Sequence, residues 1–431
     1  MKILFVYPRF QRHAEAHPEL LEYVPMNEYL GSPSLGIAAI AAITPPDWEI
    51  EFRDDRVEDA ATPTDADLVA LSFFTGAAKR GMELADYFRT QGNTVVAGGI
   101  FPTMMPDEVQ PHVDAVVVGE GEATWGPLLG DFGAGTLRPR YTAEDEVDLT
   151  GLPLPDLSVY FNNEGERYQP DDYPLQISRG CALNCHACVL PYSMTRKLRC
   201  FTMEHVTGQL EQLERAGKRA CLTEDTSWFP GHSGRRRLVE LLDWIIENER
   251  TASISYIGIS MPMIQITSRK VLEKAKTAGV NMFYLVGGFD PITMKAFTGE
   301  DPKAWQRGID AIKKSLDVGI EPYTSFLLGN DQDDEGTVDR MLEFAQVSGI
   351  RKAEFAISTP YPGTPQWDAL VEQDRILTRD WSRYNDANAV FQPAQMTPDQ
   401  VTEGYLRLWR EFYADKQHYA SMDQTDRTIQ F

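Results

Sequence analysis

The sequence predicts an α/β protein with three parts: an N-terminal flavodoxin-like (Rossmann-type) parallel-sheet domain, a partial (β/α)6 barrel and a mainly helical C-terminal region. Short apolar strands alternate with helical segments over residues 1–148, and a linker rich in Pro, Asp and Asn follows at 149–174. Strand–helix units then repeat over 175–364, and 365–431 reads as mainly helical. Buried strands that alternate with helices are typical of parallel sheets covered on both faces.

Composition and charge narrow the classes of protein. The 431 residues are 42% hydrophobic and 24% charged, enough for a large core, and the net charge is −23. That charge argues against binding to nucleic acid or to anionic lipid. We find no apolar run of transmembrane length, and the start MKILFVYPRF lacks a signal-peptide cleavage site. Five cysteines, an odd number, favour a metal site in the reducing cytoplasm over disulfides.

The N-terminal elements place small residues at the ends of strands. Strands are expected at 2–6, 48–53, 67–72, 94–97 and 114–118, and helices at 35–43 and 76–89. Ligands of such sheets bind at the carboxyl ends of the strands, where glycine lets backbone approach them closely. The candidate cofactor-binding residues there are Ser72, Phe73, Thr75, Gly98, Gly99, Pro102, Thr103, Gly119 and Glu120. Tight turns explain the glycines equally well, and both interpretations stay open.

Six strand–helix units predict the barrel. Strands are expected at 175–179, 219–224, 253–260, 281–288, 321–328 and 352–358, and helices at 203–217, 235–248, 268–278, 302–318 and 335–347. Six units are fewer than the eight that close a complete barrel, so we expect an open, partial one. The C-terminal region contains a predicted helix over 397–413, with Pro398 near its start.

Three cysteines lie close together in the segment SRGCALNCHAC, directly after the first predicted barrel strand. Barrels carry their chemistry at this face, and thiolates are the usual ligands of iron–sulfur clusters. We therefore predict that Cys181, Cys185 and Cys188 hold a 4Fe–4S cluster with one iron left open, and that Gly180 lets the loop turn away from its strand. Zinc with His186 as fourth ligand is the alternative, although a histidine between two bound cysteines is sterically awkward.

This CxxxCxxC loop at the head of a partial β/α barrel resembles the signature of the radical S-adenosylmethionine (AdoMet) superfamily. The resemblance implies that AdoMet chelates the open iron, and that one-electron reduction cleaves it to a 5′-deoxyadenosyl radical. It also implies an electron donor such as flavodoxin or ferredoxin. The chain departs from the family pattern at Ala187, where an aromatic residue usually precedes the third cysteine. That change removes a packing contact near the adenine but no ligand.

The N-terminal segment resembles the cobalamin-binding domain that is fused to many radical AdoMet enzymes. The matching stretches are YPRF, SPSLGIAAIAA, SFFT, AGGIFPT and VVVGEGEATW, and the resemblance continues through LQISRGC and STPYPGTPQW. The DxHxxG motif of cobalamin-dependent mutases is absent, and DDRVED at 54–59 stands at the comparable place. Cobalamin is thus expected to bind without a protein histidine on its lower face. A degenerate domain that binds no corrinoid is the alternative.

The resemblance also implies AdoMet contacts at the ends of later barrel strands. The segment CLTEDT closes the second strand, where Glu224 or Asp225 would accept a hydrogen bond from the AdoMet ammonium group. A helix N-cap at Asp225, Thr226 or Ser227 is the other interpretation. Ser260 ends the third strand and Asp290 follows the fourth, where they would approach the ribose and methionine parts of AdoMet. Each of these two fits a turn equally well.

The residues around the substrate are less sharply defined. Aromatic residues near the predicted top face either line an apolar substrate pocket or belong to the core: Tyr192, Trp228, Phe229, Tyr284 and Tyr361. Cys200 and Cys221 are expected to be inert core thiols, with a catalytic thiol or an extra ligand as the alternative. The sequence singles out no catalytic residue beyond the cofactor sites.

The leading hypothesis is a cobalamin-dependent radical AdoMet enzyme that functionalises an unactivated carbon of a small molecule, by methyl transfer. The cofactors would do the hard chemistry and the protein would position them. Ring formation, ring contraction or oxidation with the same cofactors is the first alternative, and a non-catalytic corrinoid or iron–sulfur carrier is the second. By resemblance, the substrate would be a lipid, a tetrapyrrole or another natural product.

Overall fold

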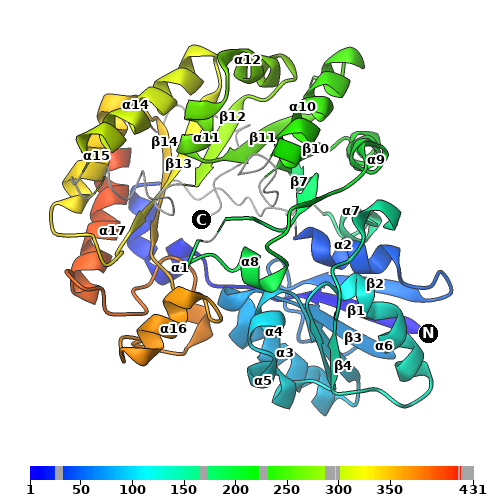
Figure 1. The fold of residues 1–431 in the computed structure, drawn as a ribbon. Helices are drawn as coiled ribbons and strands as arrows, with labels where there is room; N and C mark the ends of the chain where they lie inside the picture. Colours follow the sequence, from blue (N-terminus) through cyan, green and yellow to red (C-terminus); the bar gives the residue numbers. More distant parts are fainter. Residues whose placement is uncertain are drawn as a thin grey trace.

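The predicted fold class is confirmed. The computed structural model describes residues 1–24, 33–165, 170, 172–183, 185–222, 232–251, 253–286, 297, 301–415 and 418. Within these ranges the chain forms two six-stranded parallel sheets, one in the N-terminal domain and one in the barrel, and a two-stranded ribbon. Figure 1 shows the barrel with its outer helices on one side of the molecule and the N-terminal domain on the other.

The N-terminal sheet has the strand order β2-β1-β3-β4-β5-β6, which is the flavodoxin-like order with one added edge strand. Its strands are β1 (Lys2–Tyr7), β2 (Glu49–Asp54), β3 (Leu68–Ser72), β4 (Thr94–Gly98), β5 (Ala115–Val118) and β6 (Arg140–Thr142). The main helices are α2 (Leu35–Ala42), α3 (Ala78–Thr90), α4 (Ile100–Met104) and α6 (Trp125–Gly133). The inner strands β1 and β3 are almost wholly buried, whereas the edge strand β2 is only partly buried. The short strand β6 was not predicted.

The barrel sheet has the order β14-β13-β12-β11-β10-β7 and is parallel throughout. Its strands are β7 (Asp172–Pro174), β10 (Arg219–Leu222), β11 (Ile254–Ile259), β12 (Met282–Val286), β13 (Glu321–Leu328) and β14 (Lys352–Ile357). The outer helices are α9 (Met203–Arg215), α10 (His232–Glu247), α12 (Arg269–Thr277), α14 (Pro302–Asp317) and α15 (Thr337–Ser348). Consecutive strands are neighbours, as β/α repetition predicts, and among the described strands the sheet keeps two open edges.

The first predicted barrel strand, 175–179, is divided in the structure. Strand β7 pairs with β10 and ends just before this range, and the backbone of Leu175 still donates a hydrogen bond to Cys221 O at 2.8 Å. The chain then leaves the sheet. Its next strand, β8 (Ser178–Arg179), pairs with β9 (Arg199–Cys200) in the antiparallel ribbon. The cysteine loop therefore joins the two strands of a hairpin.

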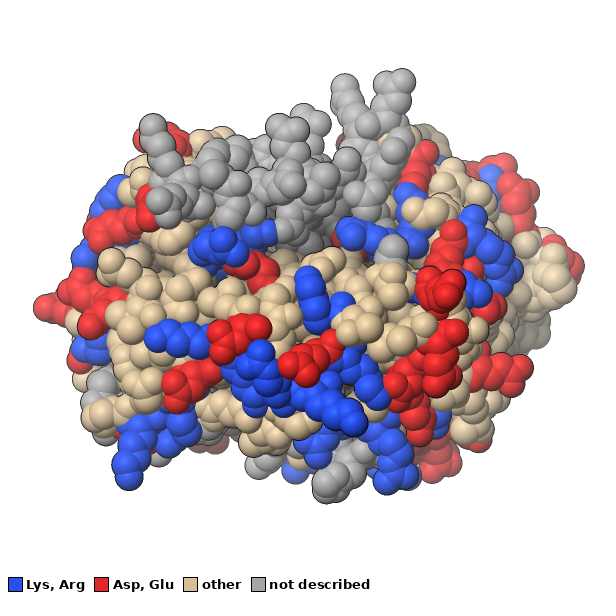
Figure 2. Space-filling model, turned by 90° about the horizontal axis from the view of Figure 1, so that it is seen from above, with Lys and Arg blue, Asp and Glu red and all other residues tan. Residues whose placement is uncertain are grey.

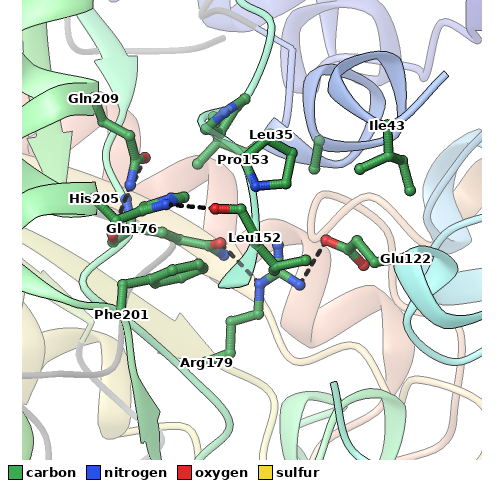
Figure 3. Close-up of a pocket in the computed structure, with 12 residues that line it drawn as sticks. Leu35, Ile43, Glu122, Leu152, Pro153, Gln176, Arg179, Phe201, His205 and Gln209 are labelled. Atoms are coloured by element: carbon green, nitrogen blue, oxygen red, sulfur yellow. Dashed lines mark hydrogen bonds and ion pairs between the residues drawn. The ribbon is translucent and has the colours of Figure 1, made fainter. Parts of the chain in front are cut away.

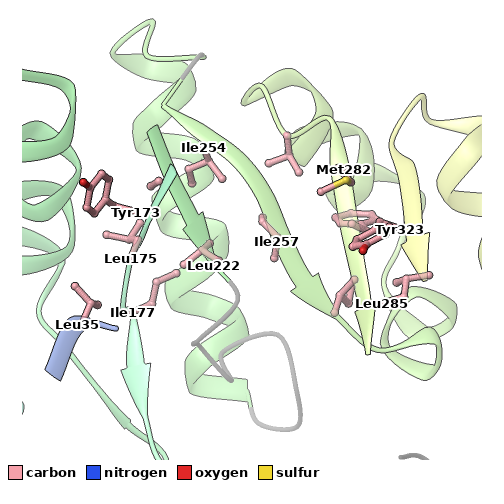
Figure 4. Packing of buried hydrophobic residues seen from close by; sticks show 14 of the residues in the cluster. Leu35, Tyr173, Leu175, Ile177, Leu222, Ile254, Ile257, Met282, Leu285 and Tyr323 are labelled. Carbon is pink, nitrogen blue, oxygen red and sulfur yellow. The ribbon is translucent and has the colours of Figure 1, made fainter. Parts of the chain in front are cut away.

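The hydrophobic core runs from one domain into the next. Leu35 of α2 belongs to the same buried cluster as Tyr173, Ile177 and Leu222 of the barrel, and Figure 4 shows these side chains together. A second cluster joins Phe73 and Phe101 of the N-terminal domain to aromatic residues of the C-terminal region, which are Trp367, Trp381 and Tyr384.

The C-terminal region is helical and bridges the other two parts. It includes α16 (Pro365–Glu372) and α17 (Pro398–Tyr413), and α17 packs on α15 and β14. Thr397 caps α17, whose first residue is Pro398. This region therefore holds the barrel and the N-terminal domain together.

Charges of both signs are interspersed on the face shown in Figure 2. Between the outer barrel helices, Lys274 Nζ lies 2.5 Å from Asp243 Oδ1, and along α12 Arg269 Nε lies 2.9 Å from Glu273 Oε1. Exposed pairs of this kind contribute about 0–1 kcal/mol each to stability. None of the helices in the described ranges combines the length and the apolar character needed to span a bilayer.

Candidate cofactor site between the barrel and the N-terminal domain

The cysteine loop is held by a hairpin stem and by its own backbone. Gly180, the first residue after β8, has a φ of +87°, and a Cβ at this position would overlap the carbonyl oxygen of Lys197. Next to it, the backbone N–H of Cys181 donates to Thr195 O at 3.0 Å. After the third cysteine the chain forms the short helix α8 (Leu190–Ser193), which packs against α4 of the N-terminal domain. Figure 1 shows α8 between the barrel and the N-terminal sheet.

The three thiols lie near one another and are partly shielded from water. Cys181 is buried, while Cys185 and Cys188 are partly exposed. Burial raises the pKa of the Cys181 thiol, and the pKa of Cys188 is raised by burial and by the charges of Cys185 and Cys181. Mutual repulsion of this kind is relieved when thiolates bind cationic iron. The donor set therefore fits an iron–sulfur cluster.

The zinc alternative finds no support in the described residues. Among them, no three Cys, His, Asp or Glu side chains converge as they would around a single metal ion. In a four-iron cluster each thiolate binds a different iron, so the sulfurs need not converge on one point. The carbonyl oxygen of His186 accepts a hydrogen bond from the Gln366 backbone at 3.1 Å, which ties the loop to the start of α16.

Small residues form a cradle at the carboxyl edge of the N-terminal sheet. Gly99 has a φ of +100°, and a Cβ there would lie 2.9 Å from Phe73 O and 3.1 Å from Ser72 Oγ. On the next strand the N–H of Gly119, whose φ is +86°, donates to Thr103 Oγ1 at 3.1 Å. Ser72, Gly98, Gly99, Thr103 and Gly119 are thus brought to one edge, and this cradle of small groups fits the close approach of a large planar cofactor.

Other predicted residues of this edge have buried side chains. The ring of Phe73 packs against Gly81 of α3 and lies 6.2 Å from the ring of Phe101. Thr75 and Pro102 are buried as well. A cofactor at the edge would meet these three residues mainly through backbone atoms.

Glu120 extends from this edge toward the barrel. Its carboxylate oxygens lie 3.2 Å from Arg179 Nη1 and 2.8 Å from Arg199 Nη1, and Glu122 Oε1 lies 2.7 Å from Arg179 Nη1. Figure 3 shows Arg179 with Gln176 on one side and Glu122 on the other. The adjoining cavity has a volume of about 10 Å³, which is room for a single water molecule and too little for a substrate.

The predicted AdoMet contacts are only partly described. Glu224, Asp225 and Asp290 lie outside the described residues, as do the aromatic candidates Trp228 and Phe229. Ser260 is buried at the end of β11, as expected. Its carbonyl oxygen accepts from Met263 N at 3.0 Å and Ile264 N at 3.1 Å, so it also starts the next helix.

A pair of tyrosines and a carboxylate face one another across three barrel strands. Tyr284 of β12 stands beside Tyr323 of β13, and their hydroxyls donate to Glu354 of β14 at 2.5 and 3.0 Å. Burial raises the pKa of both phenols well above the usual value, and the negative charge of Glu354 raises it further. This array gives the barrel sheet a polar patch.

A second phenol–carboxylate pair lies nearer the cysteine loop. Tyr361 donates to Asp386 Oδ1 at 2.8 Å, and the charge of Cys188 contributes to the raised pKa of Tyr361. Burial raises the pKa of Asp386 to about 6. The sequence indicates Tyr284 and Tyr361 as site candidates but does not single out Glu354 or Asp386. A charged residue inside the apolar strand KAEFAI was the available signal for Glu354.

The remaining cysteines and Tyr192 lie apart from this array. Cys221 is buried in β10, and Cys200 is partly exposed in β9. Tyr192 lies on α8, where the guanidinium of Arg196 sits 5.4 Å from its ring centre.

All three histidines of the first 148 residues are engaged elsewhere. His13 Nδ1 lies 2.9 Å from Tyr405 OH, His17 Nε2 lies 2.7 Å from Ala387 O, and His112 Nδ1 lies 2.8 Å from Asp86 Oδ2. Burial lowers the pKa of His13 to about 4. The contacts of His13 and His17 tie the segment after β1 to the C-terminal region.

Comparison with known proteins agrees with this architecture. Residues 32–128 match the family model of the B12 binding domain. Bacteriochlorophyllide d C-8(2)-methyltransferase of Chlorobaculum tepidum is 26% identical over 395 residues, which cover 89% of this chain and 86% of that protein. Hopanoid C-2 methylase of Rhodopseudomonas palustris is 26% identical over 390 residues, covering 88% and 72%. Anaerobic magnesium-protoporphyrin IX monomethyl ester cyclase of Rubrivivax gelatinosus is 23% identical, covering 85% and 69%.

A solved structure shares the fold over almost the whole chain. The cobalamin-dependent S-adenosylmethionine radical enzyme OxsB aligns with a TM-score of 0.69 at 13% identity, over 98% of this chain and 72% of its own. The partial barrel and the N-terminal sheet together have the fold of that enzyme. The chain thus has a B12 binding domain in front of a partial barrel, and it is similar in sequence to methyltransferases and in fold to a cobalamin-dependent radical AdoMet enzyme.

Proposed function

We propose that the chain is a cobalamin-dependent radical AdoMet C-methyltransferase, which cleaves AdoMet to a 5′-deoxyadenosyl radical and adds a methyl group to an unactivated carbon of a small molecule. One observation carries the proposal: the loop of three cysteines packs, through α8, against α4 at the small-residue edge of the B12 binding domain. The two proposed cofactor sites would therefore be neighbours, as a reaction that uses both requires.

The chain's own residues would divide the work between holding and orienting. Cys181, Cys185 and Cys188 would hold the cluster, and the small-residue edge at Ser72 and Gly99 would admit the corrinoid. When bound, the cluster supplies the electron for AdoMet cleavage and the corrinoid supplies the methyl group. We propose no protein histidine on the lower face of the corrinoid, and the engagement of His13, His17 and His112 elsewhere supports this.

The proposed contacts to AdoMet and substrate are assigned from the places of residues at the ends of the barrel strands. We propose Glu224 or Asp225 for the AdoMet ammonium group, and Ser260 and Asp290 for the ribose and methionine parts. The phenol–carboxylate patch at Tyr284 and Glu354 would orient a polar group of the substrate, because a phenol and a carboxylate offer directed hydrogen bonds.

The partners are proposed by chemical class. Relatives act on tetrapyrroles and a hopanoid, so we propose a largely apolar lipid, tetrapyrrole or natural product as the substrate. A flavodoxin or ferredoxin would supply electrons, and the enzyme would work in the cytoplasm. The reducing compartment suits three free cysteines that serve as cluster ligands.

The test uses anaerobically reconstituted protein, a strong reductant and AdoMet labelled in its methyl group, incubated with candidate tetrapyrroles and hopanoids. We expect 5′-deoxyadenosine together with a labelled product. Replacing the three cysteines with Ala should abolish both the iron–sulfur absorbance and AdoMet cleavage. 5′-Deoxyadenosine without label in the product would instead indicate ring formation or oxidation. No 5′-deoxyadenosine at all would refute the radical enzyme.

A further inference from the structure

Two arginines face each other at the stem of the cysteine loop. Arg179 of β8 and Arg199 of β9 are paired residues of the antiparallel ribbon, one on each side of the loop that holds the three cysteines. Like charges in this arrangement repel each other unless an anion lies between them. The anion is Glu120, which contacts Nη1 of Arg199 at 2.8 Å and Nη1 of Arg179 at 3.2 Å. We call these three residues the stem clamp.

The three side chains of the stem clamp are nearly buried, so the stability of each charge depends on its ion-pair partner. The side chains of Glu120, Arg179 and Arg199 are each 10% exposed. Glu122, which is 7% exposed, balances the second positive charge at Arg179. A buried ion that loses its partner is far more costly than an exposed one, because water cannot replace that partner.

Arg199 depends most on Glu120. Its Nη1 also donates to Val147 O at 2.6 Å, but its Nε and Nη2 are buried without a hydrogen-bond partner among the described residues. Glu120 is its only ion-pair partner in that part of the chain. Loss of the Glu120 charge would leave Arg199 buried and uncompensated, and the hairpin stem would shift to expose it.

Glu120 connects the stem clamp to the small-residue edge of the B12 binding domain. The residue directly follows Gly119, whose N–H is bonded to Thr103 at the small-residue edge of the B12 binding domain. The next residue, Gly121, passes so close to Ile40 of α2 that a Cβ would lie 2.8 Å from its Cδ1. The Glu120 backbone is thus held by the cobalamin edge, while its side chain holds both ends of the cysteine loop.

We propose that Glu120 is a positioning residue that couples occupancy of the cobalamin site to the geometry of the cluster loop. This inference rests on the proposed function, since it requires both cofactors. A change in the β5 edge when the corrinoid binds would move Glu120 and, with it, the stem of the cysteine loop. Coupling of this kind is reciprocal: the cluster must favour cobalamin by the same factor by which cobalamin favours the cluster.

The experiment measures cobalamin affinity in two states of the full-length protein. Hydroxocobalamin is titrated, with absorbance as the readout, into protein with a reconstituted cluster and into protein without it. We expect the cluster to tighten binding by about fivefold or more, the lower end of typical coupling between sites. In Glu120→Gln, which keeps the shape and removes the charge, the two affinities should become equal.

A matched control separates the stem clamp from other contacts to the same loop. Glu146 also contacts the loop, through Lys197 Nζ at 3.4 Å, but this carboxylate is 38% exposed. Glu146→Gln should keep the coupling. Arg199→Lys is the second variant, since it retains the charge without the forked geometry. It should reduce the coupling while circular dichroism stays that of the wild type, so that the test stands even if Glu120→Gln fails to fold.

Each outcome decides between accounts. If Glu120 contacts the cofactor directly, Glu120→Gln would weaken cobalamin binding equally in both states, and the coupling proposal would fail. If Glu120→Gln keeps the wild-type ratio, the stem clamp is purely structural and the proposal is overturned. A wild type that loads both cofactors independently contradicts only this inference, whereas a wild type that loads neither contradicts the proposed function itself.

Discussion

Gly180→Ala is expected to damage the cluster site without unfolding the protein. Gly180 is the hinge between β8 and Cys181, and its φ of +87° is unfavourable for any residue with a Cβ. The added methyl group would also overlap the Lys197 carbonyl and lie 2.7 Å from Thr195 Cγ2. Both neighbours belong to the far side of the same loop, so relief of the overlap must open the loop.

The free-energy cost of Gly180→Ala has two contributions. The left-handed backbone costs about 1–2 kcal/mol for a non-glycine residue, and overpacking against backbone atoms adds about 1–3 kcal/mol. Together they disfavour the native loop conformation by about 2–5 kcal/mol. The population of the loop conformation that presents Cys181 correctly should therefore fall more than tenfold. Gly217→Ala is the matched control, because Gly217 has a φ of +71° but no atom within 4 Å of an added Cβ.

The assay is iron and sulfide content after anaerobic reconstitution with limiting iron, followed by 5′-deoxyadenosine formation. We expect Gly180→Ala to hold well under half of the wild-type iron, and Gly217→Ala to match the wild type. Far-ultraviolet circular dichroism should be unchanged in both variants. Wild-type iron content and AdoMet cleavage in Gly180→Ala would refute the argument that the loop geometry depends on this glycine.

Two further substitutions test other parts of the site. Gly99→Ala should weaken cobalamin binding at least tenfold, because the added Cβ would lie 2.9 Å from Phe73 O. Gly92→Ala is the control and should not weaken binding, because Gly92 also has a positive φ, of +92°, but has open space around it. Equal cobalamin affinities of the two variants in a titration would contradict the prediction. Burial raises the pKa of Asp386 from 3.8 to about 6, so its ionisation costs stability as pH rises through this window. Asp386→Asn, which tolerates the φ of 60°, should therefore be more stable than the wild type by about 3 kcal/mol at pH 8 and about 2 kcal/mol at pH 5.5. Urea unfolding of the cofactor-free protein measures this difference, and a gain that does not change with pH would count against the buried carboxylate.

Local patterns were enough to predict the two sheets and the cysteine loop. Strands such as Leu68–Ser72 are apolar at every position before the final serine, and only burial on both faces explains that pattern. Gly180 was expected to turn the loop, and its positive φ agrees with that expectation. The strand expected at 175–179 was wrong in detail, because pairing of Arg179 with Arg199 depends on a segment twenty residues away.

Contacts between distant segments were beyond the reach of the sequence. Glu120 read as a residue at a strand end, and nothing in its neighbourhood indicates two arginines from the barrel hairpin. Glu354 likewise became a candidate only when β12 and β13 placed tyrosines beside it. The side chain of Phe73 was expected at the cofactor edge. The direction in which this ring points depends on packing between distant segments, and it packs against Gly81.

The most direct test of the central claim is the metal content of anaerobically purified protein together with its turnover of AdoMet. The account predicts about four iron and about one cobalt per chain, with 5′-deoxyadenosine formed on reduction. Iron and cobalt should both be present in the same preparation, because the helix that follows the cysteine loop packs against the B12 binding domain. Zinc in place of iron, or loaded protein that leaves AdoMet intact, would contradict the claim.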